Sequence, residues 1–228
     1  MGKYKYETHS HTSETSKCSL ADGASLAKYY ASLGYTVLFI TDHFFNGNTT
    51  VSRDGEWNDR VKAFLKGYEN AKKRGDEIGI KIFFAWEYSY RGTDFLTYGP
   101  SPEWLYEHPE VMSMNTNEYC RFIRENGWYI FHAHPFREAG SIDMIRLIPR
   151  DVDGVESYNA CRTEFENAMA DQYADNYSLL KIAGSDNHVG ALNTLGAMEF
   201  EKPMESLLDI IEAVKGGEGK FAYVNPVE

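Results

Sequence analysis

The sequence predicts a single α/β domain in which mainly parallel strands form a barrel, with fewer than eight full repeats. Short apolar, β-branched or aromatic runs of strand length alternate with segments of helical spacing along all 228 residues. Some of these runs are apolar throughout, such as Val37 to Ile40, which is typical of strands buried on both faces of a parallel sheet. No Gly/Ser-rich linker divides the chain, so we expect one domain over residues 1–228.

Six runs are predicted to be strands, and five of them end in side chains that bind metals or protons. The six runs are residues 3–7, 36–40, 81–86, 128–131, 154–159 and 179–183. In a closed barrel the carboxyl ends of all parallel strands meet at one face, where barrel enzymes carry their active sites. An open doubly wound sheet would gather these strand ends less evenly.

The intervals between these runs have helical spacing. The predicted helices are residues 24–33, 57–74, 117–125, 164–177 and 204–215. Gly34, Gly75 and Gly127 are expected to end the first three in the left-handed conformation that glycine adopts at a helix C-terminus. Pro203 precedes the last helix, and Gly216 follows it.

Charge and composition limit the partners of the chain. Asp and Glu outnumber Lys and Arg by 34 to 23, a net charge of −11, whereas binding to long nucleic acid depends on Lys and Arg. No apolar run approaches the roughly 20 residues of a membrane span, and no apolar leader follows Met1, so we expect a cytoplasmic protein that does not bind membranes. The sequence does not indicate an oligomeric state.

The three cysteines are widely spaced and include no CxxC pair. This spacing disfavours both a disulfide framework and a cysteine-based zinc site. Any metal is therefore expected to be bound by nitrogen and oxygen.

Six of the seven histidines lie at the predicted strand ends. A single histidine is more often a core or surface residue than a ligand, but this joint placement predicts a metal site. Three pairs of candidate ligands are each spaced two residues apart, so that on an extended backbone both side chains point to the same side. The pairs are His9 with His11, His132 with His134, and Asp186 with His188.

Glu87 follows the apolar run 82–86, where an unpaired carboxylate would be costly to bury. Bridging two cations with its two oxygens would offset that cost, and a salt bridge with a neighbouring Lys or Arg is the alternative. Asp42 precedes His43 and is expected to orient that histidine.

These motifs together resemble the PHP family, the phosphoesterase domain named after polymerases and histidinol phosphatases. The matching pieces are His9-Ser10-His11-Thr12, Thr41-Asp42-His43, Glu87, His134-Pro135 and Gly184-Ser185-Asp186-Asn187-His188. The resemblance implies a distorted (β/α)7 TIM-like barrel with two or three divalent metal ions, commonly zinc, manganese or iron, that hydrolyses phosphate esters.

The resemblance also implies how the ligands are shared among the ions. The first ion would be held by His9, His11, Glu87 and Asp186. Glu87 would bridge to a second ion that His134 also binds, and His43 with His188 would bind a third.

The chain departs from the family pattern at two places. Many members carry an Asp or His a few residues after the first H-x-H motif, and Glu14 is the expected substitute here. Many members also carry a further His after the bridging Glu, where this chain has Phe95. The second ion then lacks one ligand, which His132 could supply unless it has an orienting or packing role.

The expected reaction is hydrolysis of a small phosphate monoester, resembling histidinol phosphate or a nucleotide, by a metal-activated water, with Glu87 and Asp186 as catalytic ligands. Arg137 and Arg162 are expected to bind the phosphate, because the guanidinium fork matches two oxygens. The alternatives are a short-oligonucleotide or nucleoside-bisphosphate phosphatase or nuclease, an amidohydrolase-type barrel, which usually needs a metal-bridging Lys, and a non-catalytic metal-binding module.

Overall fold

The computed structural model describes residues 4–226, so Lys3, the first residue of the first predicted strand, lies outside the described residues. The strands are β1 (Tyr4–Glu7), β2 (Tyr35–Ile40), β3 (Lys81–Tyr90), β4 (Thr93–Tyr98), β5 (Tyr129–Ala133), β6 (Gly154–Asn159), β7 (Leu180–Gly184), β8 (Leu195–Phe200) and β9 (Lys220–Val224). The helices are α1 (Gly23–Ser32), α2 (Trp57–Phe64), α3 (Lys66–Ile78), α4 (Pro102–Glu107), α5 (Thr116–Glu125), α6 (Glu164–Tyr177) and α7 (Leu207–Lys215), with one 3₁₀ turn at Pro109–Met112.

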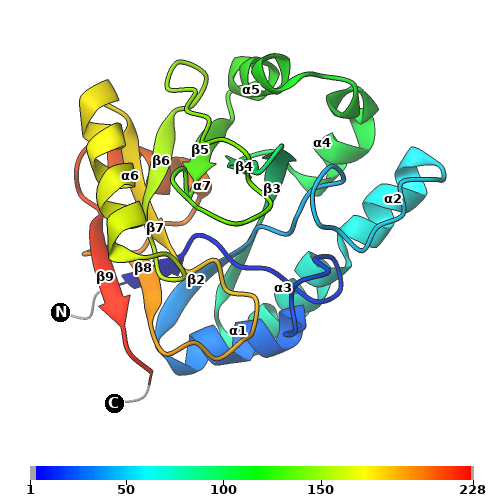
Figure 1. Ribbon diagram of the computed structural model, residues 1–228. Helices are drawn as coiled ribbons and strands as arrows, with labels where there is room; N and C mark the ends of the chain where they lie inside the picture. Colours follow the sequence, from blue (N-terminus) through cyan, green and yellow to red (C-terminus); the bar gives the residue numbers. More distant parts are fainter. Residues whose placement is uncertain (1–3, 227–228) are drawn as a thin grey trace.

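The described strands form one sheet in the order β7-β6-β5-β4-β3-β2-β1-β8-β9. β1, β2 and β3 pair in parallel, as do β5, β6 and β7. β7 also lies against β8, so the sheet curls into a nearly closed barrel, and Figure 1 shows helices around its outside, with α6 beside β6 and α1 beside α3. This confirms the predicted α/β barrel.

The sheet is less parallel than predicted. β4 pairs antiparallel with both β3 and β5, and β8 pairs antiparallel with both β1 and β9. β4 is the second arm of a hairpin whose two-residue turn, Arg91-Gly92, has positive φ at both residues, 49° and 80°. Such turns match the twist of paired strands, which is why the chain returns here instead of crossing over through a helix.

The predicted helix 57–74 is two helices, because the chain turns at Leu65 between α2 and α3. α3 then runs through Gly75 and ends before Gly79, whose φ of 81° is the left-handed cap that we expected at Gly75. Gly75 instead serves packing, since a Cβ there would lie 2.6 Å from the carbonyl oxygen of Ile80. The expected left-handed glycines at Gly34 and Gly127 are confirmed, with φ of 76° and 81°.

Parallel pairing continues past the strand ends into the loops that carry the candidate ligands. Isolated bridges join Ser10 to Asn187 and His43 to Glu87. The backbone N–H of His11 donates to the carbonyl of Asn187 at 3.0 Å. These bonds fix the ligand loops to the barrel and to one another.

Among residues 4–226, no helix has the length and apolar character needed to cross a membrane.

Gly67 allows α3 to pack directly on the loop that follows β1. A Cβ at Gly67 would overlap the Thr12 hydroxyl and lie 2.8 Å from Asp42 Oδ2, and both side chains are buried. Thr12 cannot move aside without losing its 2.6 Å hydrogen bonds to Asp42.

We therefore expect Gly67→Ala to lower the free energy of unfolding by about 1–3 kcal/mol, the usual cost of overpacking. Urea denaturation measures this change. Gly140→Ala is the matched control, because a Cβ there meets no atom within 4 Å. An equal effect of the two substitutions would show that the contact at Gly67 relaxes freely.

Candidate metal centre

Histidines and carboxylates from five strands meet at one face of the barrel, with Glu87 inside β3 and the others in the segments that follow β1, β2, β5 and β7. Three groups each place their ligand atoms within 4.8 Å of one another. The groups are His9, Glu87 and His134; His9, His11 and Asp186; and His11, His43 and His188. The structure therefore brings together every predicted metal ligand except Glu14.

The first two histidines aim one nitrogen each at Asp186. The Nε2 atoms of His9 and His11 lie 3.0 Å apart, and Asp186 Oδ1 lies 3.4 and 3.3 Å from them. His9 Nδ1 lies 2.9 Å from Glu156 Oε1, and His11 Nδ1 lies 3.3 Å from Ser16 Oγ. Donation of Nδ1–H to these oxygens leaves both Nε2 lone pairs free for a metal.

Glu87 contacts members of all three groups. Its Oε1 lies 3.0 Å from His134 Nε2 and 3.5 Å from His9 Nε2. Its Oε2 lies 2.6 Å from His43 Nδ1 and 3.7 Å from His11 Nε2. No Lys or Arg pairs with Glu87 among the described residues, which removes the salt-bridge alternative.

The two central carboxylates show why this cluster fits cations. Glu87 and Asp186 are 1% and 5% exposed, and Glu87 Oε2 and Asp186 Oδ1 accept no hydrogen bond from the described residues. Burial favours protonation of Glu87, but His43 and His134 hold the pKa of its carboxyl well below its usual range. Buried, ionised oxygens without donors are costly, and divalent ions would satisfy them.

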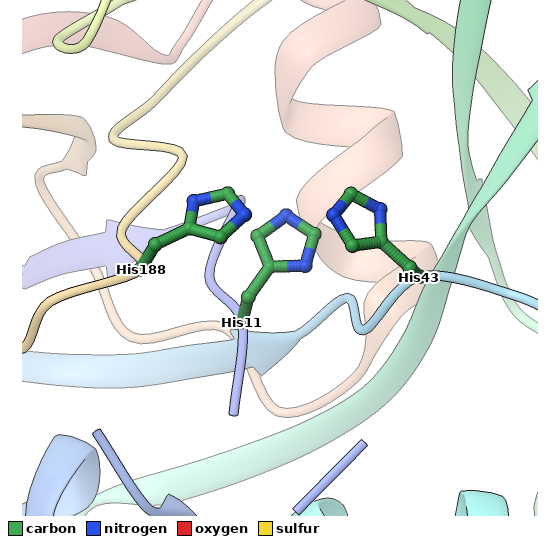
Figure 2. Close-up of side chains that lie close together, drawn as sticks. All are labelled: His11, His43 and His188. Carbon is green, nitrogen blue, oxygen red and sulfur yellow. The ribbon is translucent and has the colours of Figure 1, made fainter. Parts of the chain in front are cut away.

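Figure 2 shows the rings of His11, His43 and His188 side by side, with His11 in the middle. Its ring centroid lies 4.4 Å from that of His43 and 4.1 Å from that of His188. Burial and the two neighbouring histidines lower the pKa of His11 well below its usual value. His11 is therefore neutral, which is the form that binds metals.

Glu14 lies away from this cluster. Its carboxylate accepts hydrogen bonds from the Gly23 N–H and from Asn70 Nδ2, so it contacts α1 and α3. Asp42 was expected to orient His43, but its carboxylate accepts hydrogen bonds from Thr12 and from Ser16 Oγ. Because Ser16 contacts the ring of His11, Asp42 orients His11 through Ser16 and does not bind the ring of His43.

His132 lies apart from the three groups. Both of its ring nitrogens are buried without a hydrogen-bond partner, and its ring lies 5.0 Å from Phe95 and 6.0 Å from Tyr173. Burial lowers its pKa to about 3. The expectation that it shares a side with His134 fails because β5 ends at Ala133 and His134 has a φ of 27°.

Three residues of the site lie outside the sequence predictions. Cys18 Sγ lies 3.1 Å from His43 Nε2, Asp94 of β4 pairs with Ala133, the residue before His134, and Glu156 orients His9. Burial favours the neutral thiol, but hydrogen bonds with His188 and His43 lower the pKa of Cys18 to about 6. Of Cys18, Asp94 and Glu156, only Glu156 had a signal in the sequence, which was its position inside a predicted strand.

A cavity of about 560 Å³ opens onto these groups, and its wall contains both acidic and basic side chains. Arg91, Arg137 and Arg162 line it together with Glu87 and Asp186. Arg137 Nη1 lies 3.3 Å from Asp94 Oδ2, and Arg162 Nε has no hydrogen-bond partner among the described residues. The two arginines that were predicted to bind phosphate thus face the same cavity as the metal-type ligands.

Comparison with known proteins supports the fold. Residues 164–218 match a family model described as PHP-associated. A sequence comparison with curated proteins finds no match. The model is similar to a two-domain protein from Bacteroides vulgatus ATCC 8482 that contains a predicted PHP-like metal-dependent phosphoesterase, with a TM-score of 0.71 and 15% identity. The likeness covers 97% of this chain but only 65% of that protein, which is just under two thirds of its length.

Two further structures cover nearly the whole of both chains. One is a protein from Bifidobacterium adolescentis ATCC 15703 that is named as a metal-dependent phosphoesterase by prediction. Its TM-score is 0.58 at 15% identity, and the likeness covers 91% of this chain and 94% of that protein. An amidohydrolase from Chromobacterium violaceum with bound sulfate has a TM-score of 0.56 and 14% identity, over 97% of this chain and 98% of its own. At these identities the likeness concerns the fold. Together with the family match it confirms the resemblance to the PHP family.

We expect His132→Leu to leave the metal content unchanged, because neither nitrogen of His132 faces the ligand groups. It should also reduce the loss of stability in acid. The pKa of His132 is about 3 in the folded protein and 6.5 in the unfolded chain. Between these two pH values the unfolded chain binds one more proton than the folded protein. The free energy of unfolding of the wild-type protein therefore falls as the pH is lowered through this range.

Metal analysis and urea denaturation at neutral and mildly acid pH measure the two effects. Loss of one metal ion per chain would instead show that His132 is a ligand.

Proposed function

Because the chain has a PHP-like fold and matches the PHP-associated family model, we propose that it is a metal-dependent phosphoesterase that hydrolyses a small phosphate monoester. The observation that carries this proposal is one cavity lined both by arginines and by two buried carboxylates that each have an oxygen without a hydrogen bond. The carboxylates and histidines suit divalent cations, and the arginines suit a phosphate.

The ligand groups support two or three ions, with zinc, manganese and iron as candidates. His9, His11, Asp186 and Glu87 would hold the first ion, and Glu87 and His134 the second. His43 and His188 would hold a third. When bound, such ions activate a water molecule and neutralise charge that develops on the phosphate oxygens.

The residues around the ions would position the substrate. Arg137 contacts Asp94 through one amino group, so its fork is held at the cavity wall with further N–H groups available for an anion. Arg162 lines the same cavity, and its buried Nε has no hydrogen-bond partner among the described residues. Two such guanidinium groups would orient a phosphate toward the ligand cluster.

The size and chemistry of the cavity favour a small phosphate ester over the alternatives. A volume of about 560 Å³ suits a metabolite or nucleotide, and the net charge of −11 disfavours a long nucleic acid. None of the described residues that line the cavity is a lysine, so the metal-bridging Lys expected of an amidohydrolase-type site has no candidate there.

We expect the metal-loaded protein to release phosphate from a panel of small monoesters. Glu87→Gln should lower this rate by more than about 100-fold and lower the metal content, since groups that only orient ligands already contribute 10–100-fold. Glu125→Gln, which changes an exposed residue of α5, is the matched control. A fully metal-loaded protein inert toward every phosphate ester, or one that prefers amides, would contradict the proposal.

Arg137→Ala should lower kcat/KM about 10- to 100-fold while metal content stays unchanged, because the lost hydrogen bonds involve charged groups worth about 1.5–3 kcal/mol each. Arg137→Lys should recover only part of the loss, since an ammonium group lacks the planar fork. Arg121→Ala, on the outer surface of α5, controls for loss of a positive charge. Loss of metal from Arg137→Ala would assign Arg137 a structural role instead.

A further inference from the structure

His11 belongs to two of the three ligand groups, but each of its nitrogens can bind only one ion. Its Nε2 lies 3.0 Å from His9 Nε2 and 3.3 Å from Asp186 Oδ1, so it faces the first ion position. Its Nδ1 lies 3.3 Å from Ser16 Oγ. With both nitrogens of His11 engaged, the third group retains only His43 and His188 as donors.

Cys18 is placed to supply the missing donor. Its Sγ lies 3.1 Å from His43 Nε2, and it lines the cavity with His43 and His188. His188 Nδ1 lies 2.8 Å from the carbonyl oxygen of Asp186, so donation of Nδ1–H leaves Nε2 free for a ligand. Glu14 is not available for this role, because its oxygens bind Gly23 and Asn70.

A contact with Glu87 determines which nitrogen of His43 faces Cys18. Glu87 Oε2 and His43 Nδ1 form an ion pair at 2.6 Å. Glu87 is 1% exposed and His43 is 9% exposed. Because Nδ1 of His43 is turned toward Glu87, its Nε2 lies on the other side of the ring and faces Cys18 Sγ at 3.1 Å.

We propose that Cys18 binds the third ion as a thiolate and that Cys18, His43 and His188 are its protein ligands. This inference rests on the proposed multi-metal site. Binding releases the thiol proton to solvent as the S–metal bond forms. One of the three cysteines would thus bind metal, whereas the sequence led us to expect nitrogen and oxygen ligands alone.

A thiolate makes the third position different from the other two. One sulfur and two imidazole nitrogens form a soft ligand set that favours zinc, iron(II) or cobalt over magnesium and manganese. Three protein ligands also leave one tetrahedral position open to a water or a phosphate oxygen, as in catalytic zinc sites. The carboxylate-containing positions impose no such selection.

Cobalt(II) titration of the metal-stripped, full-length protein tests the proposal without reference to turnover. The wild-type protein should develop the near-ultraviolet thiolate-to-cobalt charge-transfer band and bind one more cobalt ion than Cys18→Ser. Cys161→Ser is the matched control, since Cys161 is also exposed and lines the same cavity, and it should retain the band. Cys18→Asp should restore the cobalt count without the band.

A band that persists in Cys18→Ser, or no band in the wild type, would overturn the assignment. Circular dichroism and thermal unfolding verify that each variant is folded. Failure of the proposed function can be distinguished from failure of the Cys18 assignment. A protein that shows the band but hydrolyses no ester keeps the Cys18 assignment. A protein that hydrolyses esters but shows no band loses only Cys18.

Alkylation by iodoacetamide separates metal binding from the alternative that Cys18 and His43 form a nucleophile pair. Saturating zinc should protect Cys18 and leave Cys161 reactive in the same molecules, as measured by peptide mass spectrometry. Equal labelling of both cysteines in the presence of zinc would overturn the proposal. Loss of ester hydrolysis on alkylation, combined with activity that survives chelation, would favour the nucleophile pair.

Discussion

Two buried carboxylates determine what the carboxyl end of this barrel can contain. Glu87 and Asp186 are almost completely buried, and each has an oxygen without a hydrogen-bond donor. Negative charge of this kind is stable only beside positive charge, because burial penalises the ionised form. The histidines supply part of that charge, and divalent ions would supply the rest. Bound ions would therefore stabilise the cluster, which would link metal binding to folding stability.

The barrel keeps these ligands in place through a second set of buried hydrogen bonds. Glu156 holds His9, and the chain of contacts from Asp42 through Ser16 holds His11. Glu7 accepts hydrogen bonds from the backbone N–H groups of His9 and Ser185, and its burial raises its pKa to about 7. Glu7 thereby joins the end of β1 to the end of β7. Ligands from distant parts of the sequence are positioned by the same strands that close the barrel.

The clustering of the candidate ligands was predictable because its signal is local, a histidine or carboxylate at or after the end of an apolar run. The remaining features depend on tertiary structure. Asp94 reaches the cavity through the hairpin at Arg91-Gly92, and its strand has no counterpart in a regular alternation of strand and helix. The spacing of His132 and His134 predicted a shared side, but the backbone turns at His134. Two residues, Glu14 and Cys18, lie in one loop, and only the folded loop shows which of them faces His43.

The acidic composition of the chain can be reconciled with a phosphate substrate through the site itself. Two or three divalent ions would outweigh the charges of Glu87, Asp186 and a Cys18 thiolate, so the cavity would become positive within an acidic protein. Arg137 and Arg162 extend that positive region along the wall. The net charge of −11 would oppose large polyanions, whereas a cavity of about 560 Å³ would admit a small phosphate ester. Charge as well as shape would therefore favour a small substrate in the proposed reaction, because a small anion would reach the ions without placing further negative charge against an acidic protein.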